Sequence, residues 1–593
     1  MPFKDQFGFR GMYTDLEPSG VPDGGLIAGT KNVRVKDDVL TCRAGNKLLQ
    51  AAALLGTPLS TYTHTLIDGT EFLIVGTTTD VYYFDSDTGA FKFLTPTYIT
   101  GTADCSAGTT VEGTGTDWVT GAIASGDHIK FGTQNPDTAG TPDTWYEIDD
   151  VTDLNTLELT GNGPDTTVAV NYVIRLNYAA TEAIRWSFTS FYESGEAENL
   201  LIATNGVDGP QSWAGGGGDE LASISGAPTA KYCGVFGGRL FFGNIVSILG
   251  TGVATPYTVI WSPVATFDAW TGGATDDAGY QELYETPGDI KFLAPFGYYM
   301  CVGKSDAMIL LNASGNATTP FTPNYIIKGR GPAYSTYGLI NQNIAFISKD
   351  DISLFNGSPN LTSIVDGKIR RAFFSNINND YKHLVVSKHS ERNKEWIITL
   401  PSLDAIVNDH SWVYNWEINE WFYDDAGYST VGSSNYEAGI TINELTSAID
   451  SYTQTINSFA PQRAFRDIVY FDSDGYAYIE TDILKQLNGV NIEAVAVTKD
   501  YIGSDINVKD RFLEMWYVYQ ETDSASDIIG VQASFDRGVS YNDAQYLTPN
   551  IASNRLEERV SWNEVGKMAR VMFTGRFFKI FSLKLMFTPQ GIR

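Results

Sequence analysis

The sequence predicts an all-β protein built around a β-propeller, with an inserted small β-barrel domain and a C-terminal β-sandwich-like region. Two observations carry this prediction. Runs of alternating apolar residues pass through tight Asp- and Gly-rich turns into a second such run, as at 81–93 and 468–478, and this pattern is the strongest short-range signal of a β-hairpin. Looser copies at 352–357 and 412–423 spread the hairpins along most of the chain, which favours the radial repetition of a propeller.

Length and charge set limits on the function. The chain has 593 residues, with 40 Lys and Arg against 70 Asp and Glu and a formal net charge of −30. Because one hydrophobic core seldom extends over so many residues, we expect several modules. The acidic balance argues against a protein that grips nucleic-acid phosphates, although such a charge also simply serves solubility. We find no apolar run of membrane-spanning length and no signal-peptide core, so we expect a soluble protein made in the cytoplasm.

Changes of composition along the chain predict its domains. Residues 11–29 are polar and rich in Gly and Pro, which is typical of an arm that becomes ordered only against another surface. Between 96 and 178 Thr, Gly and Asp dominate and short strands follow closely, as in a small separate barrel. We predict a docking arm at 1–30, a propeller at 31–95 and 179–482, an inserted barrel at 96–178, and a β domain at 483–593 that closes or extends the propeller.

Several patterns invite an enzymatic interpretation. The stretch Ser-Phe-Asp-Arg-Gly-Val-Ser-Tyr at 534–541 is close to the Asp-box of sialidase propellers, a hairpin turn held by its own side chains, so we interpret it as structural. The Asp doublets at 149–150, 350–351 and 424–425 cannot each be a glycosidase pair, because adjacent strand residues point to opposite faces. We interpret them as turn or solvated residues.

Metal and redox chemistry are not indicated. Cys42, Cys105, Cys233 and Cys301 are isolated in the sequence, so we expect buried free thiols rather than a zinc site or a disulfide framework. The Asp-rich turns at 85–89 and 472–475 lack the Glu that completes an EF-hand loop, and we interpret them as plain hairpin turns. No catalytic residue, metal or cofactor is therefore predicted, and we do not expect an enzyme.

Three short patterns open the chain in order: Val-Pro-Asp-Gly at 21–24, Ala-Gly-Thr-Lys-Asn-Val at 28–33 and Leu-Thr-Cys-Arg-Ala-Gly at 40–45. Together they resemble the opening of the tail nozzle and packaged-DNA stabilisation (tail hub) proteins of short-tailed bacteriophages. Further stretches are similar to that family in the same order, at 231–242, 260–270, 288–293, 329–331, 344–357 and 559–573. The stretches at 111–118 and 126–129 resemble a small barrel module common in phage tail proteins.

The resemblance implies a structural protein of the virion tail, made in the host cytoplasm. It implies a homohexameric nozzle ring at the distal end of the tail, in contact with a tail adaptor ring and with tail fibres or spikes. Such a ring retains packaged DNA and forms the channel for its ejection, and an acidic lining lets DNA pass without specific binding. In the Gly-rich segment 206–226, Asp208, Asp219 and Glu220 are the candidate lumen-loop residues.

A second hypothesis belongs to another class. Propellers on virion or cell surfaces also bind or degrade carbohydrates, and the chain carries 32 Tyr and 12 Trp that could serve sugar binding. A carbohydrate-active or carbohydrate-binding β-propeller is therefore the alternative, and the sequence alone leaves it open.

Overall fold

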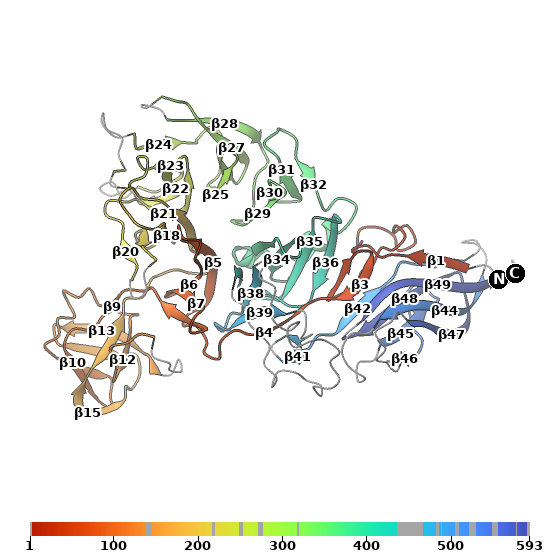
Figure 1. The fold of residues 1–593 in the computed structure, drawn as a ribbon, viewed down its shortest axis with the longest axis horizontal. Helices are drawn as coiled ribbons and strands as arrows, with labels where there is room; N and C mark the ends of the chain where they lie inside the picture. Colours follow the sequence, from red (N-terminus) through yellow and green to blue (C-terminus); the bar gives the residue numbers. More distant parts are fainter. Residues whose placement is uncertain are drawn as a thin grey trace.

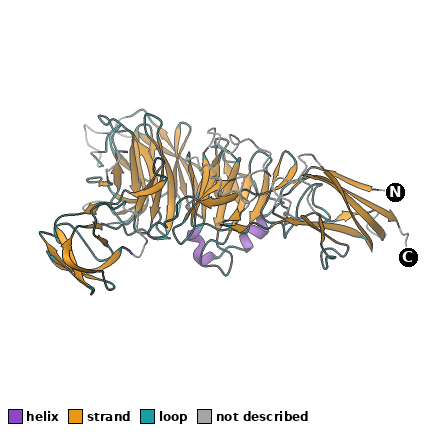
Figure 2. Cartoon of the chain, turned by 60° about the horizontal axis from the view of Figure 1, so that its bottom comes forward, coloured by secondary structure: helices purple, strands orange, loops and turns teal. Residues whose placement is uncertain are grey.

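The predicted fold class is confirmed by a computed structural model of the chain, whose regular secondary structure is almost entirely β-strand (Figures 1 and 2). A propeller forms the middle of the molecule, the inserted domain lies at one end, and both termini lie at the other end with the C-terminal sandwich. The structure describes residues 3–137, 144–215, 220–247, 253–267, 269–270, 277–316, 320–435, 466–481, 486–487, 489–503, 509–520, 529–547, 556–576 and 578–589.

Within these residues, seven four-stranded antiparallel sheets form the propeller blades. The first blade has β5 (Pro58–Thr65), β6 (Glu71–Thr77), β7 (Val81–Asp85) and β8 (Ala90–Phe93). The next three have β17 (Ser187–Phe191), β18 (Leu200–Thr204), β19 (Gln211–Trp213), β20 (Ala222–Ser223); β21 (Thr229–Phe236), β22 (Arg239–Ser247), β23 (Thr255–Trp261), β24 (Gly279–Glu282); and β25 (Ile290–Phe296), β26 (Tyr299–Lys304), β27 (Ala307–Ala313), β28 (Phe321–Lys328).

The fifth and sixth blades have β29 (Tyr337–Ile340), β30 (Asn343–Ile347), β31 (Ile352–Phe355), β32 (Thr362–Ser363) and β33 (Val386–Ser390), β34 (Glu395–Leu400), β35 (His410–Asn415), β36 (Glu420–Asp424). Between them lie the short helix α1 (Arg370–Ser375) and the 3₁₀ helix η2 (Asn379–Leu384). The first strand of each blade faces the propeller axis, and these strands follow one another around it.

The seventh blade joins the two ends of the propeller sequence. Its strands β37 (Thr430–Ser434), β38 (Asp467–Phe471) and β39 (Ala477–Thr481) are completed by β4 (Gly45–Leu48), with Leu48 opposite Tyr478. A ring closed in this way leaves few exposed strand edges. The closing strand begins later than the predicted propeller boundary at residue 31, because the preceding strands β2 (Val33–Lys36) and β3 (Val39–Cys42) belong to a sheet of the C-terminal sandwich. In that sheet β2 pairs with β3, and β3 pairs with a C-terminal strand.

The inserted domain is an eight-stranded sheet that lies within the range predicted for it. Its strands are β9 (Thr97–Tyr98), β10 (Thr102–Ser106), β11 (Thr110–Thr114), β12 (His128–Phe131), β13 (Tyr146–Asp153), β14 (Thr156–Leu159), β15 (Asp165–Val170) and β16 (Tyr172–Arg175). Its core centres on Trp118, which is fully buried and donates from Nε1 to the Tyr172 hydroxyl at 2.9 Å. The first and last strands pair, and Leu176 N donates to Pro96 O at 2.9 Å, so the chain leaves the insert where it entered.

The C-terminal region is a sandwich of a six-stranded and a five-stranded sheet. One sheet holds β1 (Phe3–Phe7), β2, β3, β44 (Asp510–Gln520), β47 (Leu556–Gly566) and β49 (Lys579–Pro589), and the other holds β42 (Ala494–Val497), β43 (Tyr501–Ile502), β45 (Ile529–Ser534), β46 (Gln545–Leu547) and β48 (Met568–Gly575). A separate pair is formed by β40 (Gln486–Leu487) and β41 (Val490–Asn491). The sandwich core, with Met515 and Val571, continues into the sixth and seventh blades at Phe422 and Tyr470.

The predicted N-terminal docking arm lies against its own chain. Tyr13 donates to Glu420 at 3.0 Å, and Met12 N donates to Trp421 O at 2.8 Å, which fastens the segment to the outer strand of the sixth blade. Gly11 has no room for a side chain there, because a Cβ would lie 2.7 Å from Trp421 O. The segment also reaches the sandwich, where Lys499 pairs with Asp23 at 2.8 Å.

Candidate functional site

The insert is anchored to the propeller by one buried cation. Arg175, the last residue of β16, forms a fully buried ion pair with Asp80, which lies in the turn before β7. Its guanidinium carbon also lies 4.4 Å from the centre of the Phe93 ring and 4.2 Å from that of Trp145. A buried ion pair of this kind fixes geometry, because neither charge is tolerated without its partner.

Two of the three candidate lumen residues lie at the root of the insert. Asp208 accepts from Ala179 N at 2.9 Å and from Asn205 Nδ2 at 2.6 Å. Glu220 accepts from Thr97 N at 3.1 Å and from the Thr97 hydroxyl. They therefore hold the two chain segments that connect the insert to the propeller. Asp219 lies outside the described residues, and the prediction that these carboxylates face a DNA channel stays a prediction.

The sandwich is anchored by a second buried cluster, which the sequence interpretation missed. Arg34 in β2 donates to both oxygens of Asp424 in β36, at 2.8 and 2.6 Å, and to Glu395 Oε1 at 2.9 Å. Arg43 lies 3.2 Å from the same Asp424 carboxylate. Burial opposes ionisation of Asp424, but the charges of Arg34 and Arg43 outweigh it and hold the pKa of that carboxyl below its usual value.

One member of each of two Asp doublets is buried rather than solvated. Asp424 is buried in the ion cluster rather than solvated, and Asp351 is also buried, accepting from the hydroxyls of Ser353 at 3.1 Å and Ser363 at 2.7 Å. Asp149 and Asp150 are exposed, as interpreted. A signal for Asp424 existed in the sequence, since it ends an aromatic-rich strand that is apolar on both faces. Its partner Arg34 was not recognisable from the sequence, because the two residues are 390 positions apart in the chain.

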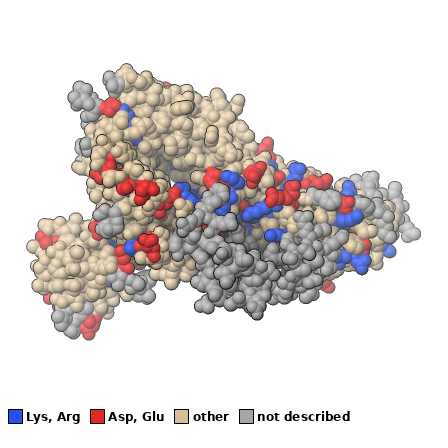
Figure 3. All heavy atoms as spheres, in the orientation of Figure 1, with Lys and Arg blue, Asp and Glu red and all other residues tan. Residues whose placement is uncertain are grey.

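A seam of surface charges runs beside the buried cluster. Figure 3 shows acidic and basic side chains intermixed where the propeller meets the sandwich. Lys31 contributes to it, with Nζ 3.0 Å from Asp425 and 3.2 Å from Glu493. Exposed pairs of this kind each stabilise little, so the continuous hydrophobic core and the buried Arg34 cluster contribute more to the junction.

The Asp-box is structural, as predicted from its sequence. Asp536 accepts from Ser540 N at 2.9 Å and from the Ser534 hydroxyl at 2.7 Å, and Gly538 N donates to Ser534 Oγ at 2.7 Å. Hydrogen bonds from Ser540 and Ser534 lower the pKa of Asp536 to about 2. These side-chain bonds of Asp536 stay within one turn, so its carboxylate serves to hold the turn.

The Asp-rich turn at 472–475 is held by bonds within the turn itself. In the turn at 472–475, Asp472 accepts from Asp474 N at 3.0 Å and from Tyr476 N at 2.8 Å, which is the bonding of an ordinary Asp-led turn. All four cysteines are buried, and none of them forms a disulfide in the part of the chain that the structure describes. Among the described residues, no group of three His, Cys, Asp or Glu side chains is arranged to hold a metal ion. No described helix is long and apolar enough to cross a membrane.

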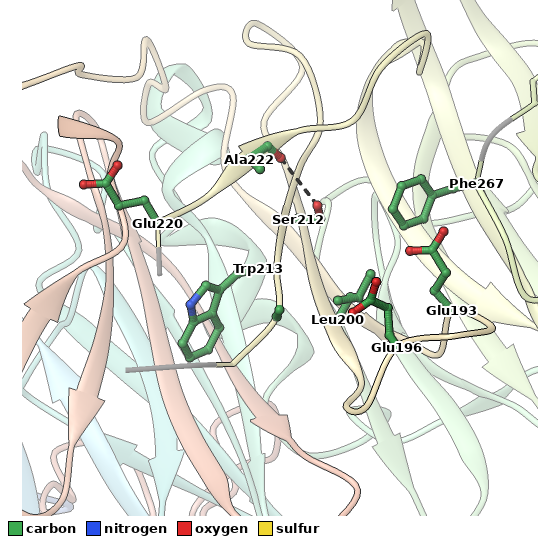
Figure 4. Close-up of a pocket in the computed structure, with 9 residues that line it drawn as sticks. Glu193, Glu196, Leu200, Ser212, Trp213, Glu220, Ala222 and Phe267 are labelled. Atoms are coloured by element: carbon green, nitrogen blue, oxygen red, sulfur yellow. Dashed lines mark hydrogen bonds between the residues drawn. The ribbon is translucent and has the colours of Figure 1, made fainter. Parts of the chain in front are cut away.

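An open pocket on the second blade combines acidic and aromatic residues (Figure 4). It has a volume of about 500 Å³, and its lining includes Glu193, Glu196, Glu220, Trp213 and Phe267. Glu193 and Glu196 lie together on one side, whereas Glu220 lies on the other side of Trp213. Glu196 and Glu220 are exposed to solvent, and Trp213 is only 2% exposed, so the indole offers no open face for stacking.

The propeller axis holds a second cavity, of about 480 Å³. Its wall takes residues from the innermost strand of every blade. Hydroxyl groups bond across the gaps between blades, as between Thr336 and Ser387 at 2.6 Å and between Tyr232 and Ser335 at 2.8 Å. Burial raises the pKa of the Tyr232 hydroxyl to about 12, so it stays protonated and donates.

Comparisons with known proteins leave the chemistry open. No protein-family profile and no curated protein matches the chain. Among solved structures, the chain is similar to an exo-β-1,3-galactanase from Phanerochaete chrysosporium with galactose, at 10% identity over 82% of this chain and 96% of that one, with a TM-score of 0.21. It is also similar to BBS1N in complex with ARL6DN, at 9% identity over 74% and 97% of the chains, with a TM-score of 0.26.

A third match is titled a glycoside hydrolase, at 10% identity over 74% of this chain and 94% of that one, with a TM-score of 0.17. At these identities and scores the three matches carry no argument about activity, and the function must be argued from the residues of this chain.

Proposed function

We propose that the chain is a structural subunit of a bacteriophage tail, which assembles into a homohexameric nozzle ring at the distal end of the tail. The ring retains packaged DNA and forms the channel for its ejection. The proposal is supported by the ordered sequence patterns that resemble the tail nozzle family, and by a protein architecture suited to assembly. It assigns no catalytic residue.

The observation that carries the proposal is the pair of buried anchors. Arg175 fastens the insert to one side of the propeller, and Arg34 fastens the sandwich to another. Domains joined by loose linkers move independently by default, so two buried ion pairs point to a requirement for rigidity. A rigid subunit with β modules at both ends is suited to head-to-tail contacts, which close into a ring when the rotation permits.

The partners follow from the same proposal. The ring contacts a tail adaptor ring and tail fibres or spikes, and DNA passes through it without specific binding. The formal charge of −30 supports this, because a net negative protein repels a polyanion over about a Debye length of 10 Å at 0.1 M salt.

The test is the assembly state of the full-length protein. Native mass spectrometry of the purified chain, alone and with its tail neighbours, should give six copies, and electron microscopy of the virion should place them at the tail tip. A protein that stays monomeric with every tail neighbour, or that lies elsewhere in the virion, would overturn the proposal.

The carbohydrate alternative is favoured by one feature, the pocket of Figure 4. Glu193 and Glu196 lie together there, and paired carboxylates are the groups that glycoside hydrolysis uses. A glycan array and a hydrolysis screen with host surface polysaccharides would test whether the chain binds or cleaves carbohydrate. Binding or cleavage that disappears in Glu193→Gln/Glu196→Gln would establish the alternative, whereas no response leaves the nozzle proposal in place.

A further inference from the structure

The cavity on the propeller axis differs from the rest of the protein in its charge. Five cationic side chains line it, against a single carboxylate, Asp289. The complete chain carries 30 more acidic than basic side chains. The cations come from four different blades or the segments that lead into them: Arg185, Lys231, Lys291, Lys382 and Lys388.

Two of these cations already have partners. Arg185 donates to the carbonyls of Ser429 at 3.2 Å and His383 at 3.3 Å, and also to Leu59 O, so it ties three blades together at one side of the cavity. Lys291 lies 3.0 Å from Asp289. Arg185 still adds its positive charge to the cavity, because neutral carbonyls do not cancel it.

Lys231 and Lys388 have no such partner. Among the residues that the structure describes, neither forms an ion pair or hydrogen bond with another side chain, although both line the cavity. The fifth cation, Lys382, likewise has no such contact among them, but its side chain is exposed. Burial, reinforced by the charge of Arg466, lowers the pKa of Lys388 to about 8. An ammonium in such surroundings is destabilising unless an anion compensates it.

We propose that the axial cavity binds a compact phosphate-class polyanion, with Lys231 and Lys388 as its principal charge contacts. Lysine ammonium groups bind phosphate oxygens as point charges, and several of them around one cavity match an anion with several charges. A volume of about 480 Å³ suits a small ligand. The inference concerns the single subunit and does not depend on the proposed tail function.

The test is titration calorimetry of the full-length protein with inorganic tripolyphosphate, at low and at high salt. The wild type should bind one equivalent per chain, and binding should weaken as salt rises. The variant Lys231→Gln/Lys388→Gln should bind at least about tenfold more weakly, since it loses two charge-assisted contacts. Its thermal unfolding without ligand should not fall, because the substitutions remove uncompensated charges.

The matched control is Lys349→Gln, whose side chain is 75% exposed and pairs with Asp306 outside the cavity. This variant should bind tripolyphosphate as the wild type does. Absence of binding to the wild type would overturn the proposal. Equal weakening in the control, or unchanged binding in the cavity variant, would overturn it as well, because the anion would then bind elsewhere.

Discussion

Arg34 and Asp424, which are 390 positions apart in the chain, form a bidentate ion pair with distances of 2.8 and 2.6 Å. The pair joins the strand β2 of the sandwich to the outermost strand of the sixth blade. It therefore couples the N-terminal segment, the propeller and the sandwich into one body, in a region where their hydrophobic cores are already continuous.

We expect removal of one member of this pair to be strongly destabilising. Asp424→Asn leaves the charges of Arg34 and Arg43 buried without their main partner, and should cost about 3–5 kcal/mol of unfolding free energy. Urea unfolding followed by tryptophan fluorescence measures this. Glu285→Gln is the control, because its pair with Lys328 is more than half exposed on both sides, and it should change stability by less than about 1 kcal/mol.

The same carboxyl predicts a pH dependence. The pKa of Asp424 is lower in the folded protein than its unfolded value of 3.8. Its stabilising contribution is therefore complete above pH 3.8 and is lost as the pH falls through the folded pKa. Unfolding free energies measured down to about pH 2 should fall more steeply for the wild type than for Asp424→Asn. If the unfolding free energies of the two proteins changed equally with pH, the lowered pKa of Asp424 would be contradicted.

The insert should be removable. Deleting 97–177 with a short Gly/Ser bridge joins positions that already lie together, since Leu176 and Pro96 are hydrogen-bonded. The deletion removes Arg175, so it should be combined with Asp80→Asn to avoid an unpaired buried carboxylate. We expect a soluble propeller with a cooperative thermal transition. An insoluble product lacking such a transition would show that the insert is part of the propeller fold.

The docking of the N-terminal segment should depend on Gly11. In Gly11→Ala the new Cβ meets Trp421 O at 2.7 Å and the Glu420 Cβ at 2.6 Å, so the segment must move away from the blade. Limited proteolysis should then cleave before residue 30 at least several-fold faster. Gly20→Ala is the matched control in the same segment, because its nearest contact is 3.4 Å away. Equal cleavage of both variants would contradict the close packing at Gly11.

Duplex DNA should not bind tightly to the assembled protein. The net charge opposes phosphate contacts, and we expect no submicromolar affinity in fluorescence anisotropy at about 0.15 M salt. Tight binding with a steep salt dependence would mean that a basic surface dominates the channel of the ring. The prediction that acidic side chains line the channel would then be wrong.

The sequence alone determined the local β-structure and, through its repetition, the fold class. Alternating apolar residues and Asp-led turns, such as the turn at Asp472, act over a few residues, so they are readable without tertiary information. Only the tertiary structure decided which distant segments meet. The pairing of β4 with β39, the pairing of β3 with β49 and the bond between Arg34 and Asp424 join positions more than 350 apart in the chain. The lysines of the axial cavity converge for the same reason, because no local pattern records which strands of a closed ring face one another.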